Sequence, residues 1–254
     1  MTRRGGSVRQ RSSVSQNSAL VILLAGIFYA GIAAWILALA VALLGELEWA
    51  GGFVAFALGV HLGGRLWSRL FPTPMPHFMR GVLEFPRGPH SPRRLNALLQ
   101  LRRGERILDV GPGVGVHALP VAAALLPEGV LDVLDVQQDM LDDLMRRAAS
   151  RGLTNIVPRL GDAQALPYPD RTFDAAYLIS VLGEIPDPRA ALAELRRVLK
   201  PNGRLVVCEV LIDPDYVTPA VLQDMARDAG FALERLVGPR FAYSALFPPV
   251  AATA

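Results

Sequence analysis

The hydrophobic positions of this chain follow two patterns: long uncharged runs near the N-terminus, and shorter apolar runs that alternate with helical periodicity further on. Residues 19–45 contain no charged side chain, and at ~1.5 Å per residue a helix of that length covers the ~30 Å hydrocarbon core of a bilayer. A second uncharged run, residues 49–64, is shorter, rich in glycine and contains His61. The pattern predicts a transmembrane helical hairpin over residues 19–69, with spans at 19–45 and 49–67.

The placement of charge indicates on which side of the membrane the rest of the chain lies. Arginines precede the first run, Arg65 and Arg69 follow the second, and the connection between the runs carries only glutamates. The positive-inside rule then places both ends in the cytoplasm, so we expect the remainder of the chain on the cytoplasmic side of the inner (cytoplasmic) membrane. A re-entrant or interfacial second segment is the alternative to a second span. A secretory signal peptide explains the first run poorly, because its apolar core has only ~7 to 15 residues.

After residue 104, apolar runs typical of buried strands alternate with amphipathic helical patterns. Strands are expected at 105–111, 130–136, 155–163, 173–180 and 203–210, and then at 231–237 and 241–247 without a helix between them. Such alternation predicts an α/β fold with a doubly wound parallel sheet of seven strands, whose closely spaced final pair is antiparallel.

Composition divides the chain into four segments. Residues 1–18 are rich in Arg, Ser, Gly and Gln and are expected to form a disordered cytoplasmic tail before the hairpin at 19–69. Residues 70–92 form a proline-rich, basic linker, and the α/β domain occupies 93–254. Its first helix is expected to start at Ser91, an N-cap residue, with Pro92 in the first turn.

Net charge argues against a nucleic-acid partner. The chain has a formal charge of +3 and a mean hydropathy of +0.32, but six arginines lie between Arg80 and Arg103, next to the predicted membrane segment. From residue 104 onward there are 14 basic and 20 acidic side chains, a balance of −6. We therefore expect the arginines to meet anionic lipid headgroups or solvent. The single cysteine, Cys208, rules out an intramolecular disulfide, and we expect no metal site.

The candidate chemistry lies at the ends of the first three strands. The first strand leads into the turn Gly111-Pro112-Gly113-Val114-Gly115, where glycines allow the backbone to approach a ligand closely. Its G-x-G-x-G spacing differs from the dinucleotide-binding G-x-G-x-x-G. Asp135 ends the second strand, where a carboxylate can accept two ribose hydroxyls, and Asp162 follows the third. Because ligands bind at the carboxyl edge of such sheets, these residues together predict a nucleotide-like site.

At this point the chain resembles the class I S-adenosylmethionine-dependent methyltransferases, in the branch that includes the ubiquinone and menaquinone C-methyltransferases. The resemblance covers residues 80–247 through ILDVGPGVG, VLDVQQDML, GDAQALPYPDRTFDAAYLISVLGEIPD and ELRRVLKPNGRLVVCE. It implies a Rossmann-like methyltransferase fold with S-adenosylmethionine as cofactor. The implied cofactor-binding residues are Asp109 for the glycine loop or the amino group, Gly111, Gly113 and Gly115 for the methionine part, Asp135 and Val136 for the ribose, Asp162 and Ala163 for the adenine, and Ser180 beside the methyl group.

The chain departs from this family after the fourth strand, where relatives often carry histidines and this chain reads Leu-Gly-Glu-Ile-Pro-Asp. Glu184 is the candidate replacement, as a substrate-orienting or proton-accepting group, while a capping or salt-bridging role is equally open. His117, in the helix after the turn, is expected to be a partly exposed polar residue without a role. Membrane attachment favours a small, lipid-like substrate, such as a quinone precursor or a phospholipid headgroup. The alternatives are a membrane-tethered binding or scaffold protein without catalysis and, less well supported, a nicotinamide-dependent oxidoreductase.

Overall fold

The chain divides into two compact units, Met1–Trp67 and Ser68–Ala254. The computed structural model describes residues 30–31, 33–43, 47–70, 72–77, 80–81 and 91–250. The predicted cytoplasmic tail and the first part of the predicted first span, up to residue 29, lie outside the described residues.

Helices make up the described part of the first unit. Residues 30–31 and 33–43 are helical, and α2 runs over Leu47–Leu70. The two helices contact each other through small side chains: Ala34, Ala38, Ala50 and Ala57 are all buried.

The predicted second span, 49–67, forms a helix as expected, but the prediction that it crosses the membrane is not supported. Among the described residues, no helix combines the length and the apolar character that a bilayer crossing needs. The physical reason is that the uncharged stretch of α2 between Glu48 and Arg65 has only 16 residues, including five glycines and His61, and at ~1.5 Å per residue it is shorter than the ~30 Å hydrocarbon core.

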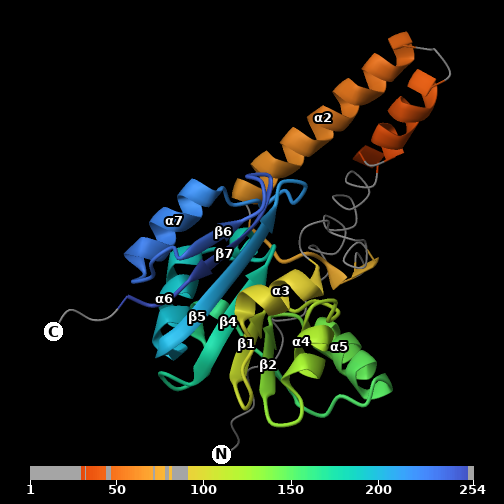
Figure 1. Cartoon of the computed structure of the whole chain (residues 1–254). Helices are drawn as coiled ribbons and strands as arrows, with labels where there is room; N and C mark the ends of the chain where they lie inside the picture. Colours follow the sequence, from red (N-terminus) through yellow and green to blue (C-terminus); the bar gives the residue numbers. More distant parts are fainter. Residues whose placement is uncertain are drawn as a thin grey trace, which may run out of the picture. The chain divides into compact units, whose positions relative to one another are not determined.

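A seven-stranded sheet organises the second unit, as the sequence predicts (Figure 1). Its strands are β1 Arg106–Val110, β2 Val130–Asp135, β3 Ile156–Leu160, β4 Phe173–Ile179, β5 Leu199–Val210, β6 Arg235–Val237 and β7 Ala242–Phe247. The order across the sheet is β3-β2-β1-β4-β5-β7-β6. The first five strands are parallel, and β7 runs antiparallel to both β5 and β6. The carboxyl ends of β1, β2 and β4 therefore meet at one edge.

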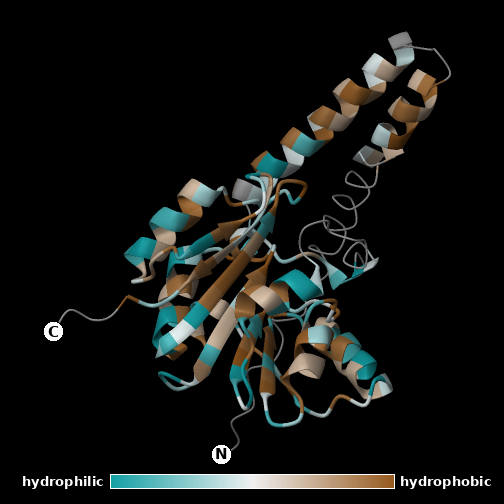
Figure 2. Ribbon diagram, in the orientation of Figure 1, coloured by the Kyte–Doolittle hydropathy of each residue, from teal (hydrophilic) through white to brown (hydrophobic). Residues whose placement is uncertain are grey.

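The strands β1, β2, β4, β5 and β7 are buried over most of their length, because most of their residues on both faces are apolar. Successive side chains of a strand point to opposite faces. Leu108 accordingly packs in a first core cluster, on one face of the sheet, and Ile107 packs in a second cluster, on the other face. The first cluster includes residues of α6 (Pro188–Val198) and α7 (Pro219–Asp228). The second includes residues of α3 (Pro92–Leu99), α4 (Ala118–Leu125) and α5 (Gln138–Ser150). In Figure 2 the central strands are hydrophobic along their length, while the helices carry hydrophilic residues on their outer sides.

Local signals set several element ends. Ser91 caps α3, with its hydroxyl accepting from the Arg94 N–H at 3.4 Å, and Pro92 occupies the first turn, as predicted. Gly152, just after α5, has a positive φ of 67°. The strand expected at 231–237 is shorter than predicted, since only residues 235–237 pair with β7 and Phe231 forms an isolated bridge with Pro249.

Candidate active site

A glycine turn follows β1 and forms the floor of a shallow hollow. Gly111, Gly113 and Gly115 have positive φ values of 70°, 53° and 86°, a region that residues with a side chain rarely adopt. At Gly111 there is a second reason for glycine, since a Cβ there would lie 2.5 Å from Cγ2 of Val181. The Gly115 N–H donates to the Pro112 carbonyl at 3.0 Å and closes the turn.

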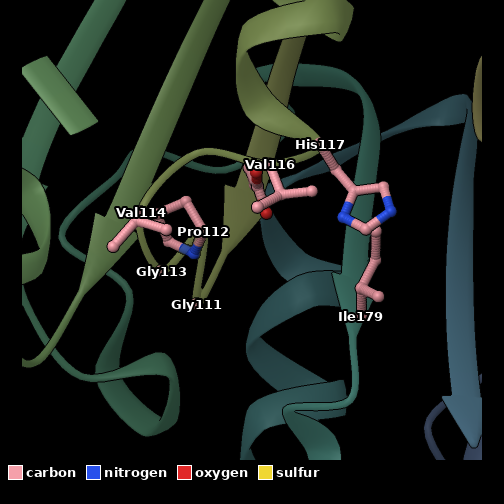
Figure 3. Close-up of a pocket in the computed structure, with 8 residues that line it drawn as sticks. Gly111, Pro112, Gly113, Val114, Val116, His117 and Ile179 are labelled. Carbon is pink, nitrogen blue, oxygen red and sulfur yellow. The ribbon is translucent and has the colours of Figure 1, made fainter. Parts of the chain in front are cut away.

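The hollow is lined by residues from the end of β1, the turn and the end of β4 (Figure 3). These residues are Asp109, Gly111, Pro112, Gly113, Val114, Val116, His117 and Ile179. His117, for which we expected no role, has its imidazole ring at the hollow beside Ile179. Its position one residue before α4 is the signal that could have placed it there.

Asp109 lies at the bottom of the hollow and is buried. Its Oδ2 accepts a hydrogen bond from the Tyr177 hydroxyl at 2.7 Å. Burial raises the pKa of the Asp109 carboxyl to about 8, with the Tyr177 bond acting in the opposite direction and the charge of Asp135 adding to the rise. The Asp109 carboxyl therefore titrates near neutral pH, and in its ionised form it can pair with a cationic group.

Asp135 ends β2, as predicted, and its carboxylate connects that strand to the glycine turn. The Gln137 N–H donates to Oδ1 at 2.9 Å, and the backbone N–H groups of Gly113 and Val136 also donate to the carboxylate. Burial raises the pKa of Asp135 to about 6, and these three bonds hold it below the value that burial alone would produce. The Val136 side chain itself is exposed.

The third predicted carboxylate has local partners. Asp162 caps the short 3-10 helix Ala163–Ala165, where its Oδ1 accepts from the Gln164 N–H at 2.9 Å. The Gln164 side-chain amide donates to both carboxylate oxygens. Asp162 is exposed, Ala163 is buried, and neither lines the hollow. Their predicted role with the adenine stays a prediction.

Ser180, directly after β4, has an unusual conformation. It is a non-glycine residue with a positive φ of 54°, and its buried hydroxyl has no hydrogen-bond partner within the part of the chain that the structure describes. Buried polar groups without partners are uncommon and often mark a place where a ligand binds. The place beside the methyl group that the family resemblance implies for Ser180 stays a prediction.

Glu184 lies in the 3-10 helix Leu182–Glu184 and accepts the Met75 N–H at 3.3 Å through Oε2. Burial, followed by the charges of Asp213 and Asp215, raises its pKa well above the usual value for glutamate. A carboxyl with a raised pKa can accept a proton near neutrality. The structure therefore leaves its proton-accepting role chemically feasible.

Met75 belongs to a segment at the site that sequence reasoning missed. While its N–H donates to Glu184, its carbonyl accepts from the Gln137 side-chain amide at 2.8 Å. Gln137 follows β2 and Glu184 follows β4, and these strands flank β1. Met75 therefore connects the segment after β2 to the segment after β4, on either side of the carboxyl end of β1.

An ionic contact on α5 holds the same segment in place. The His77 imidazole lies 2.7 Å from Oδ2 of Asp143, and the Arg80 guanidinium contacts the same oxygen at 3.2 Å. The part of the predicted linker comprising residues 72–77 is consequently one wall of the site.

Comparison with known proteins identifies the central part of this unit. Residues 107–203 match the family described as "Methyltransferase domain". The chain is 33% identical over 143 residues to a demethylmenaquinone methyltransferase of Geobacillus kaustophilus, covering 56% of this chain and 61% of the relative. It is 37% identical over 110 residues to a ubiquinone/menaquinone biosynthesis C-methyltransferase of Teredinibacter turnerae, covering 43% and 44%. The chain thus spans about half the length of the curated relatives it matches.

A solved structure of a SAM-dependent methyltransferase from Aquifex aeolicus shares the fold, with a TM-score of 0.62 at 21% identity over 68% of this chain and 97% of that one. The matched residues include the glycine turn, Asp109 and Asp135. The family and the fold together imply S-adenosylmethionine as the cofactor of this domain.

Proposed function

We propose that this chain is a membrane-attached S-adenosylmethionine-dependent methyltransferase that transfers a methyl group directly to a small, lipid-like substrate. The observation that carries the proposal is the glycine turn with Asp109 and Asp135 at its two sides. Both carboxyls have raised pKa values and both lie at the carboxyl edge of the sheet, where α/β proteins bind nucleotide-like ligands.

The residues present fit this cofactor. The glycine turn lines the hollow with Gly111 and Gly113, so backbone without side chains faces the ligand space there. The Asp135 carboxylate has the acceptor capacity for two ribose hydroxyls. The Ser180 hydroxyl is buried without a partner in the described chain, and Asp109 can pair with an amino group at the bottom of the hollow.

The protein's contribution to the reaction is alignment. S-adenosylmethionine, when bound, supplies a methyl group on a sulfonium that already carries its leaving group. Asp135 and the glycine turn fix the adenosyl part, and holding two reactants in register accounts for several kcal/mol of barrier lowering in such reactions. Met75, with both main-chain groups bonded to Glu184 and Gln137, holds these two side chains in place. Glu184 is our candidate to accept a proton from a nucleophile that must lose one.

The first unit supports attachment to a membrane. Large apolar side chains are exposed along both of its described helices: Trp35, Ile36, Leu37, Leu39, Leu43, Trp49, Phe56, Leu58, Leu62, Leu66 and Trp67. An apolar surface of this extent is typical of membrane or protein contact sites. The names of the relatives, which act in quinone biosynthesis, favour a quinone precursor as substrate, and a phospholipid headgroup is the second candidate.

Incubation of the purified protein with membranes and methyl-labelled S-adenosylmethionine tests the proposal. We expect label in the lipid extract, and less of it at sub-saturating cofactor when Asp135 is replaced by alanine. Label confined to protein or to water-soluble products would reject a lipid-like substrate, and the absence of any label would reject methyl transfer under those conditions.

A further inference from the structure

Three large apolar side chains are exposed where β5 ends and β7 begins. Ile212 is 73% exposed, Phe241 59% and Leu211 44%. Exposing one such residue is ordinary, but three neighbours at the tips of two loops form an exposed apolar surface of the kind that often marks a contact site.

Backbone contacts show that these residues form a single surface, which we name the β5–β7 lip (Leu211, Ile212 and Phe241). Val210 pairs with Ala242 at the end of the β5–β7 ladder, and the Leu211 N–H donates to the Phe241 carbonyl at 2.7 Å. The two loops therefore lie side by side and present their apolar residues from the same place in the sheet.

The loop after β5 separates charge from apolar surface. Asp213 and Asp215 are partly buried, and their charges raise the pKa of Glu184, so they lie close to the candidate active site. Leu211 and Ile212 are exposed instead. In the loop after β5, the two carboxylates therefore lie toward the candidate active site, and the two apolar side chains lie toward the outside.

Two further features indicate what covers the lip. Arg240, next to Phe241, is exposed, and a cation beside hydrocarbon suits anionic headgroups. The last turn of α2 also reaches this loop, because the Ser68 hydroxyl donates to Asp215. Leu70, two residues further along the chain, is exposed as well. Within the second unit, an exposed apolar side chain therefore follows closely after a residue that contacts the loop of the lip.

We propose that the β5–β7 lip docks on the surface of a lipid bilayer that carries anionic headgroups. This inference rests on the proposed function, which it deepens: docking brings a lipid-like substrate to the carboxyl edge of the sheet, where the glycine turn and Glu184 lie. The lip is a second membrane contact, separate from the apolar helices of the first unit. It selects substrates whose reactive group lies at the headgroup level.

Single environment-sensitive fluorophores on the full-length chain test this proposal. The labelling sites are Ile212→Cys and Phe241→Cys on the lip, Phe56→Cys in the first unit, and Leu126→Cys as a matched control. Leu126 is 45% exposed, and it follows α4 at the opposite edge of the sheet. The native Cys208 is buried, which raises its thiol pKa to about 12, so it does not compete for the label.

Vesicles of phosphatidylcholine with phosphatidylglycerol are then added, with vesicles of phosphatidylcholine alone for comparison. We expect a blue shift and a severalfold rise in emission at positions 212 and 241, weaker with the neutral vesicles, and no change at position 126.

Each of the following outcomes would contradict docking of the lip on a bilayer. A response at position 56 with none at 212 or 241 leaves membrane attachment intact but removes the lip, and an equal response at 126 indicates non-specific insertion. A change at 212 or 241 that follows protein concentration without vesicles identifies a contact between copies instead. No response at any position removes both membrane contacts, while calorimetry with S-adenosylmethionine on the same samples reports separately on the methyltransferase part.

Discussion

Replacing Asp135 with alanine removes the carboxylate that connects the end of β2 to the glycine turn. In the proposed complex this carboxylate accepts ribose hydroxyls, and a hydrogen bond to a charged group is worth about 1.5–3 kcal/mol. The substitution also removes the cost of burying the charge, which the raised pKa of about 6 reflects. The two effects oppose each other, so we expect cofactor binding to weaken by ~1 to 3 kcal/mol, or roughly 5- to 150-fold in Kd.

Isothermal titration calorimetry with S-adenosylmethionine, at a pH above 6 so that Asp135 is ionised, measures this change. The matched control is Asp142→Ala, which removes the same charge from an exposed position on α5. The Asp142 carboxylate accepts from the Gln138 side-chain amide at 2.8 Å on the exposed surface of that helix, so its loss leaves Kd unchanged. An Asp135→Ala protein that keeps the wild-type unfolding midpoint and the wild-type Kd would refute the assignment of Asp135 to the ribose.

Three further predictions follow from the same geometry. Cofactor affinity, measured by calorimetry at several pH values, falls as the pH drops through about 6, which is the pKa of Asp135 in the protein without cofactor. The reason is that only the ionised carboxylate accepts both hydroxyls. An Asp135→Asn protein that keeps the same pH dependence would contradict this. Gly111→Ala lowers the thermal unfolding midpoint, since its Cβ would lie 2.5 Å from Val181 at a positive φ, and adding Val181→Ala restores part of the loss; equal midpoints for wild type and Gly111→Ala would count against the tight turn. Arg204→Met removes the guanidinium that lies 2.7 Å from the buried Glu105 carboxylate. We expect it to lower the free energy of unfolding, measured by urea denaturation, by about 3–5 kcal/mol. A change below about 1 kcal/mol, as for an exposed ion pair, would show that this pair contributes little.

The fold of the second unit was predictable because each buried strand carries its own signal. A strand with apolar residues on both faces reads as a continuous apolar run, as in residues 106–110 and 130–135, and the helices between them supply the parallel connections. The edge strand β6 was harder to predict, because all three of its residues are exposed and no alternation marks where it starts.

The aspartates of the site were predictable from their place at strand ends, whereas Met75 was not. It contributes through its backbone N–H and carbonyl, which almost any residue supplies, and it lies in a proline-rich stretch without periodicity. Asp162 shows why a strand-end position does not by itself assign a role, since a carboxylate there can also cap the next turn, as it does with Gln164. A sequence position indicates where a side chain is, but its partners depend on packing.

The central claim is that the glycine turn and the Asp135 carboxylate together hold an adenosyl group. A crystal structure of the chain soaked with S-adenosylmethionine tests it most directly. The account predicts the methionine part against Gly111–Gly115 and the ribose hydroxyls within hydrogen-bonding distance of Asp135. Density for the cofactor at another place, or none at concentrations that saturate binding in solution, would contradict it.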